Sequence, residues 1–164
     1  MSETTMLRIE DAIQNLPAGS LRNNALSFVE FLNNEGLTPV KCPWTENKWK
    51  IPFGEYYIGW ISLSPKSWSY ENFNYLQFDE YVDDDHKFAT TIHKYVKVCK
   101  NPCHDECWGA MDVMVFDKQF NNVCSNHGLA ISNPSMKTIE HIKKLISYNK
   151  KIVPRKHIYH CHNL

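Results

Sequence analysis

Aromatic and β-branched residues dominate residues 49–78, WKIPFGEYYIGWISLSPKSWSYENFNYLQF. Such residues favour the pleated, half-buried surface of a β-strand. The pairs Gly54-Glu55 and Pro65-Lys66 interrupt the pattern with residues typical of turns. We therefore predict an antiparallel meander of three strands, at 49–53, 56–63 and 68–78.

Helical periodicity flanks this meander on both sides. Apolar residues spaced three to four apart follow Ser20, and Gly36 ends the series, which predicts a helix between them with Ser20 as N-cap. Asn133 and Pro134 predict the N-cap and first residue of a last helix. Two further helices are expected at 7–16 and 86–99, and a fourth strand at 111–116.

These elements predict an α+β fold. We expect a single domain over residues 1–164, with a mostly antiparallel sheet of about four strands packed with three to four helices. Residues 154–164 are rich in histidine and also contain Cys161, and we expect them to form a loose tail.

The charge balance excludes several classes of protein. The chain has 164 residues, and its 18 Lys and Arg balance its 18 Asp and Glu. This neutrality argues against a generally basic nucleic-acid-binding protein and against a highly charged disordered chain. No apolar run approaches the ~20 residues of a membrane span, and the first residues are polar and acidic. We expect a cytoplasmic protein without a membrane partner, whose cysteines stay reduced.

A cluster of cysteine and histidine side chains is the main candidate for chemistry. Residues 99–107, CKNPCHDEC, contain Cys99, Cys103, His104 and Cys107. Pro102 is expected to end the preceding helix near Cys99, so that the following loop can fold back and gather sulfur atoms. Zinc prefers four tetrahedral thiolate or imidazole ligands. We predict a zinc site with a structural or sensing role.

The fourth zinc ligand is left open between Cys124, His104 and His127. The cluster has neither the paired C-x-x-C spacing of zinc ribbons nor the spacing of a radical-enzyme iron–sulfur site, so an iron–sulfur cluster is the weaker alternative. The other alternative is that the cysteines pack as small apolar residues. A thiol nucleophile at Cys103 is weaker still, and no known catalytic motif is present, which argues against an enzyme without deciding the question.

The aromatic residues of the meander support a second hypothesis, a domain that binds a small molecule or a protein partner through its sheet while the cysteines are incidental. Core packing is the simpler interpretation of these rings. Single-stranded nucleic acid is an unlikely partner on sequence grounds, because only Lys48, Lys50 and Lys66 lie near the rings. The candidate ligand-binding residues are Tyr56, Trp60, Trp68, Tyr70 and Tyr75.

Overall fold

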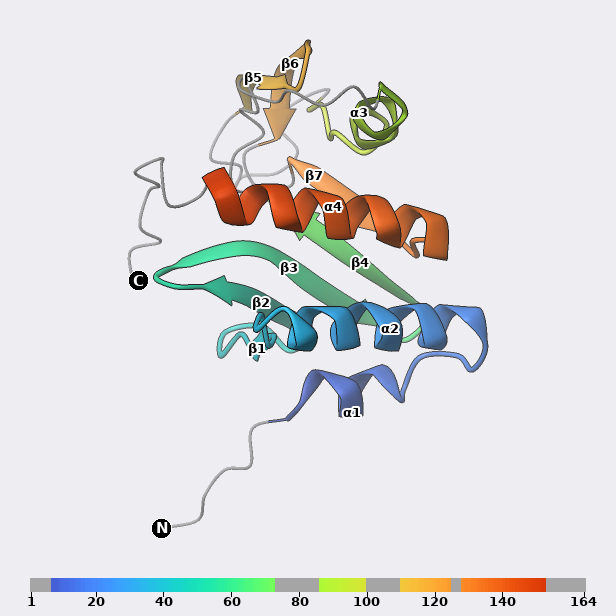
Figure 1. Cartoon of the computed structure of the whole chain (residues 1–164). Helices are drawn as coiled ribbons and strands as arrows, with labels where there is room; N and C mark the ends of the chain where they lie inside the picture. The colour runs from blue at the N-terminus through green and yellow to red at the C-terminus, as the bar shows by residue number, and fades with distance from the viewer. Residues whose placement is uncertain (1–6, 73–85, 100–109, 125–127, 153–164) are drawn as a thin grey trace. The chain divides into compact units, whose positions relative to one another are not determined.

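The computed structural model describes residues 7–72, 86–99, 110–124 and 128–152 (Figure 1). The helices are α1 (Ile9–Ile13), α2 (Ser20–Asn34), α3 (His86–His93) and α4 (Met136–Ile152). The strands are β1 (Val40–Lys41), β2 (Lys48–Phe53), β3 (Tyr56–Ser64), β4 (Ser67–Asn72), β5 (Ala110–Val115), β6 (Lys118–Cys124) and β7 (Leu129–Ser132). One sheet has the order β1-β2-β3-β4-β7, and β5 pairs with β6 in a second. The predicted α+β class with mostly antiparallel strands is confirmed.

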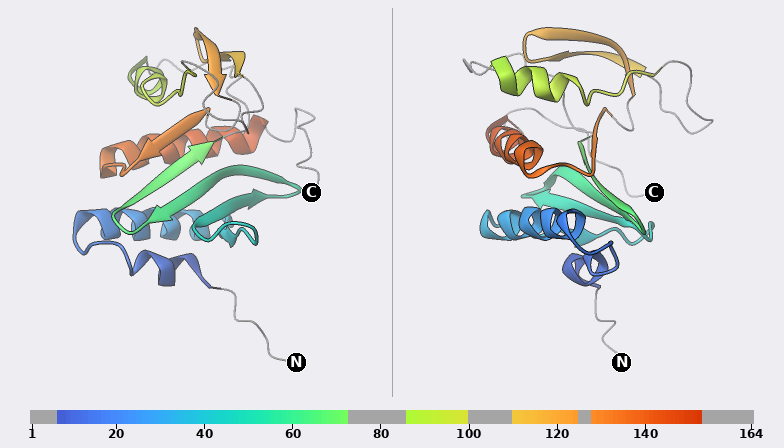
Figure 2. Two further views of the ribbon diagram at one scale, coloured as in Figure 1. Left: turned by 180° about the vertical axis from the view of Figure 1, so that it is seen from behind. Right: turned by 90° about the vertical axis from the view of Figure 1, so that its right-hand side faces the viewer.

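The chain divides into two compact units. The first unit comprises Met1–Tyr70 and Ser132–Leu164, and the second comprises Glu71–Ile131. In the first unit, α2 and α4 lie side by side against one face of the β2–β3–β4 meander (Figure 2). None of the helices in the described ranges combines the length and apolar character that a bilayer crossing requires.

Phe28 of α2 forms the centre of the first unit's core. Its ring stacks on Trp68 at a centroid distance of 5.6 Å and meets the edge of Tyr70 at 5.8 Å. All three side chains are buried, and the Tyr70 hydroxyl donates a hydrogen bond of 3.0 Å to the carbonyl oxygen of Ile58. Burying such side chains stabilises the fold by about 1.5–3 kcal/mol each. The aromatic richness of β4 thus serves core packing.

The N-termini of the long helices differ in detail from the sequence prediction. Gly19 occupies the N-cap of α2 with φ +105°, and Ser20 is the first helical residue, so the prediction of Ser20 as N-cap was wrong by one position. At α4, the Ser135 hydroxyl accepts a 3.2 Å hydrogen bond from the Thr138 backbone N–H. Asn133 instead accepts a 3.0 Å bond from the Trp68 N–H, which attaches the start of α4 to β4.

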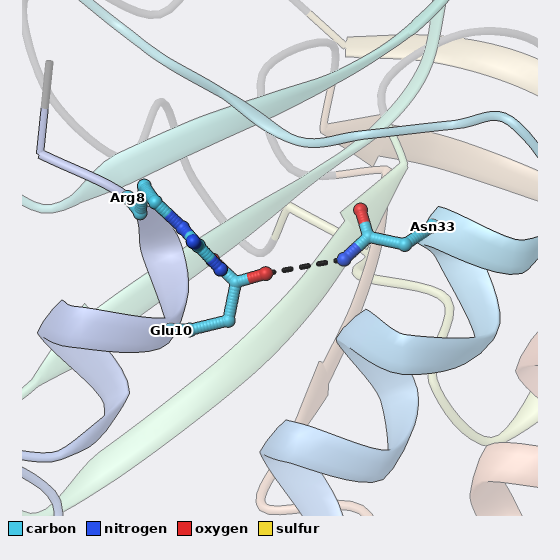
Figure 3. A network of polar contacts seen from close by, with 3 residues as sticks. All are labelled: Arg8, Glu10 and Asn33. Carbon is cyan, nitrogen blue, oxygen red and sulfur yellow. Dashed lines mark hydrogen bonds and ion pairs between the residues drawn. The ribbon is translucent and has the colours of Figure 1, made fainter.

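A polar contact joins α1 to α2 (Figure 3). The Glu10 carboxylate accepts a 3.1 Å hydrogen bond from the Asn33 amide and pairs with the Arg8 guanidinium at 3.4 Å. Partial burial raises the pKa of Glu10, but hydrogen bonds from its own backbone, Arg8 and Asn33 outweigh that effect, so that the net pKa is lowered. The contact therefore favours the ionised carboxylate.

The second unit is built around aromatic rings that surround His93. Phe88 of α3 lies 5.4 Å from Phe116 between ring centroids, and the His93 ring lies 5.4 Å from Phe120. His93 Nε2 donates a 2.8 Å hydrogen bond to the Val115 carbonyl oxygen, which fixes the proton on that nitrogen. Phe116 sits in the β5–β6 turn with φ +58°, a conformation that costs a non-glycine residue about 1–2 kcal/mol.

The helix predicted at 86–99 is too long. α3 ends at His93, residues 94–95 form a turn, and the chain is extended from Val96: Val96 bridges to Leu129 and Val98 bridges to Val123. The apolar stripe that predicted a helix up to Cys99 includes Val96, a β-branched residue that fits an extended segment better. β1, β6 and β7 were not predicted because β1 and β7 are short and polar residues interrupt the alternation of β6.

Candidate functional site

Two of the predicted metal ligands, Cys99 and Cys124, lie on neighbouring extended segments of the second unit. The Cys99 N–H donates a 2.7 Å hydrogen bond to the Asn122 carbonyl oxygen. The Cys124 N–H donates a 2.9 Å bond to the Lys97 carbonyl oxygen. Together with the Val98–Val123 bridge, these bonds form an antiparallel ladder between residues 97–99 and the end of β6.

The ladder fixes the relative register of the two thiols. Cys124 lies opposite Lys97, and Cys99 is two residues beyond Lys97 on the same segment. Because alternate residues share a face and directly opposed residues share a face, Cys99 and Cys124 occupy diagonal positions on one face. Diagonal neighbours are about 7–8 Å apart, a separation that two side chains with Zn–S bonds near ~2.3 Å can bridge. Cys99 is half-buried and Cys124 is buried.

The other predicted metal ligands, Cys103, His104, Cys107 and His127, lie outside the described residues. Within the described ranges, no group of three or more His, Cys, Asp or Glu side chains is close enough to hold a metal ion. The structure therefore brings together two members of the predicted set, and the zinc site remains a prediction.

Cys42 provides a contrast to these thiols. It follows β1 in the first unit and is 1% exposed. Burial raises the pKa of the Cys42 thiol, and the nearby Lys50 charge and Thr45 hydroxyl oppose the shift without cancelling it. Cys42 is thus a packed, protonated thiol of the kind that the simpler interpretation assigned to all six cysteines.

The predicted ligand-binding aromatics separate into different environments. Trp68 and Tyr70 lie in the core against Phe28. Tyr56 and Trp60 are half-buried, and Tyr75 lies outside the described residues. Tyr56 is paired with Phe53, whose ring lies 6.0 Å from Lys150 of α4. The sheet therefore separates these rings rather than forming one continuous set.

A β-bulge in β3 gathers a different group of side chains. Lys50 lies opposite Trp60, and Pro52 lies opposite Tyr57, so Ile51 alone faces the two residues Ile58 and Gly59. The extra residue shifts the alternation of β3, and Tyr57 and Trp60 consequently share a face although they are three positions apart. We call this surface, formed by Trp44, Lys48, Lys50, Tyr57, Trp60 and Ser62, the β2–β3 face.

Lys50 lies among the rings of the β2–β3 face. Its ammonium group donates a 2.7 Å hydrogen bond to the Tyr57 hydroxyl and lies 4.5 Å from the centre of the Tyr57 ring. The same group lies 6.0 Å from the Trp44 ring, and the Tyr57 and Trp60 rings are 5.9 Å apart. The sequence analysis did not predict that Tyr57 and Trp60 share a face with Lys50, because strict alternation does not anticipate a bulge; Gly59 was the available signal.

Comparisons with known proteins identify no relative of this chain. No protein-family model matches the chain, and neither the curated proteins nor the solved structures contain a significant match to it.

Proposed function

We propose that this protein binds one zinc ion in its second unit through Cys99 and Cys124, with two further ligands from Cys103, Cys107, His104 and His127. The observation that carries the proposal is the ladder in which Cys99 and Cys124 occupy diagonal positions on one face. Thiolate and imidazole groups are the ligands that zinc prefers. Four protein ligands leave no open coordination position, so the role is structural or sensing.

Chain connectivity supports the choice of the remaining ligands. Cys103 follows Cys99 by four residues, and His127 follows Cys124 by three. Four residues span at most about 14 Å, so each candidate is tethered near one of the two thiols of the ladder. Closing such short loops around an ion costs little conformational entropy compared with bringing distant segments together.

Elemental analysis of protein produced without a histidine tag tests the proposal. We expect about one zinc per chain, because structural sites bind zinc with apparent free energies of about 10–16 kcal/mol. Cys124→Ser and Cys99→Ser should each lower the zinc content strongly. Cys42→Ser is the matched control, since the same substitution in the first unit should leave the zinc content unchanged.

Two results would contradict the zinc site. One is a wild-type protein that holds less than about a tenth of an equivalent of zinc after mild purification and does not take up added zinc at concentrations typical of structural sites. The other is full zinc content in both Cys99→Ser and Cys124→Ser. Iron and inorganic sulfide in place of zinc would instead favour the iron–sulfur alternative.

A further inference from the structure

We propose that Asp112 is a positioning residue of the zinc site, whose carboxylate holds the bulge in β6 that sets the face on which Cys99 and Cys124 lie. This inference rests on the proposed zinc site and adds to it a residue that is not a ligand. Asp112 and the two thiols do not form a group close enough to hold a metal ion, so Asp112 acts through the backbone between them.

The bulge in β6 comes directly before Cys124. The register between β5 and β6 shifts between two pairs of opposed residues, Val113–Phe120 and Met111–Val123. β6 thus advances by three residues where β5 advances by two, and both Asn121 and Asn122 stand opposite Asp112. Bulges are frequent next to functional sites, where they change the direction of a side chain.

The bulge determines which face of the hairpin carries the thiols. Cys124 lies opposite Ala110, which is on the other face of β5 from the buried Val113. With regular pairing from Val113 onward, Val123 would lie opposite Ala110, and Cys124 would move to the face of Val113. Cys99 would move with Cys124, because the ladder fixes the two thiols relative to each other. The extra residue therefore keeps Val123 in the core and both thiols on the opposite face.

Two hydrogen bonds hold the backbone of Asn122 in the bulge. Its N–H donates a 3.0 Å bond to Asp112 Oδ1, and its carbonyl oxygen accepts the 2.7 Å bond from the Cys99 N–H. Asn122 has φ +57°, a left-handed conformation that asparagine adopts more readily than most other residues with a side chain. The carboxylate of Asp112 is thus connected through one peptide unit to the amide of a proposed ligand. Partners that orient metal ligands contribute to metal affinity.

Zinc affinity of the full chain, measured by competition with a chromophoric chelator, tests the proposal. We expect Asp112→Ala to bind zinc about tenfold more weakly than the wild type. Asp112→Asn should retain most of the affinity, because its amide oxygen can still accept the hydrogen bond from Asn122. Asp117→Ala is the matched control: it removes an exposed carboxylate from the turn of the same hairpin, 3.9 Å from His93, and should leave the affinity unchanged.

Substitutions of Asn122 test the bulge itself. Asn122→Gly should retain the zinc affinity, because glycine keeps the N–H and adopts a positive φ without strain. Asn122→Val should lower the affinity at least as much as Asp112→Ala, because β-branched residues strongly disfavour a positive φ. Hydrogen exchange of the chelated protein gives a readout that does not depend on zinc. The Cys99 amide should exchange faster in Asp112→Ala than in the wild type, and at the wild-type rate in Asp117→Ala.

Wild-type zinc affinity in a folded Asp112→Ala would overturn the positioning role and leave the zinc site standing. An equal loss of affinity in Asp112→Asn and Asp112→Ala would also overturn it, because the charge of the carboxylate and not its hydrogen bond would then matter. A wild-type chain that takes up no zinc would overturn the zinc site and, with it, the role of Asp112. Circular dichroism of each variant establishes that it is folded.

Discussion

The two units of this chain differ in what can stabilise them. The first unit buries Phe28, Trp68 and Tyr70 between two long helices and a sheet. The second unit has, among its described residues, an eight-residue helix and a two-stranded sheet, and it carries the strained Phe116. Two-stranded sheets are marginal in isolation, and small cores rarely supply more than about 3–5 kcal/mol.

The two units therefore depend on different sources of stability, side-chain packing in the first and a bound metal ion in the second. Burial of apolar side chains is sufficient to stabilise the first unit. The second unit contains Cys99 and Cys124 of the proposed zinc site, and metal binding would add the free energy that its small core lacks. Changes in the first unit should therefore alter stability without altering zinc content. Removal of the metal should destabilise the second unit and leave the first unit unchanged.

The largest effect is expected from Phe28→Ala. Removing a ring that contacts both Trp68 and Tyr70 leaves a cavity and should lower the free energy of unfolding by about 3–5 kcal/mol. Urea denaturation measures the change. The zinc content of the folded variant should equal that of the wild type, and a coupled loss of zinc would show that the two units are not energetically separable.

Gly59→Ala should destabilise the first unit by about 1–3 kcal/mol, because its packing has no space for a methyl group at this position. A Cβ atom on Gly59 would lie 2.6 Å from the Tyr70 ring carbon Cε2. Thermal unfolding checks this prediction. As a control, Ser62→Ala in the same strand, at a half-buried position of the β2–β3 face, should have a smaller effect. Equal stability of Gly59→Ala and the wild type would contradict the packing described for β3 and β4.

Thiol alkylation compares the units directly. Burial raises the pKa of the Cys42 thiol, so its reactive thiolate should be scarce at neutral pH and should increase only as the pH rises above the usual thiol range. We expect Cys42 to react more than about tenfold more slowly than half-buried Cys99 in chelated protein. Zinc should protect Cys99 and leave Cys42 unchanged, as measured by peptide mass spectrometry; equal Cys99 labelling with and without zinc would argue against ligation.

The smallest effect is expected at the junction of α1 and α2. Because hydrogen bonds lower the pKa of Glu10, its contribution is present above the ordinary carboxyl pKa and is lost as the pH falls through the lowered value. Glu10→Gln should cost about 0.5 kcal/mol at neutral pH, with the difference shrinking in acid. Exposed Asp11→Asn is the control. A difference that grew on acidification would contradict the assigned direction.

The sequence predicted the elements whose periodicity is simple. The spacing from Ser20 to Gly36 and the aromatic alternation of the meander were sufficient for α2, β2 and β3. The end of α3 was mispredicted because the valines at 96 and 98 continue an apolar pattern whose choice between helix and extended chain depends on tertiary partners, here Leu129 and Val123.

The candidate sites show the same limit. The spacing of cysteines grouped Cys99 with Cys103 and Cys107 and left Cys124 as one of three candidates for the fourth ligand, and only the ladder shows that Cys99 and Cys124 share a face. The β2–β3 face depends on one extra residue in β3. This bulge shifts the alternation of side chains, so that residues three positions apart in β3 lie on the same face. The local sequence pattern shows which residue types are present, whereas the register between paired strands determines which side chains lie next to one another.

Hydrogen exchange of the zinc-loaded and chelated protein measures whether zinc stabilises the ladder between residues 97–99 and the end of β6. We expect chelation to reduce protection of the Cys99 and Cys124 amides by more than about 100-fold, because their bonds to Asn122 and Lys97 belong to the proposed metal-stabilised ladder. The Asn133 amide, which bonds to Trp68 at 2.8 Å in the first unit, should keep its protection. Unchanged protection of Cys99 and Cys124 after complete removal of zinc would contradict the account.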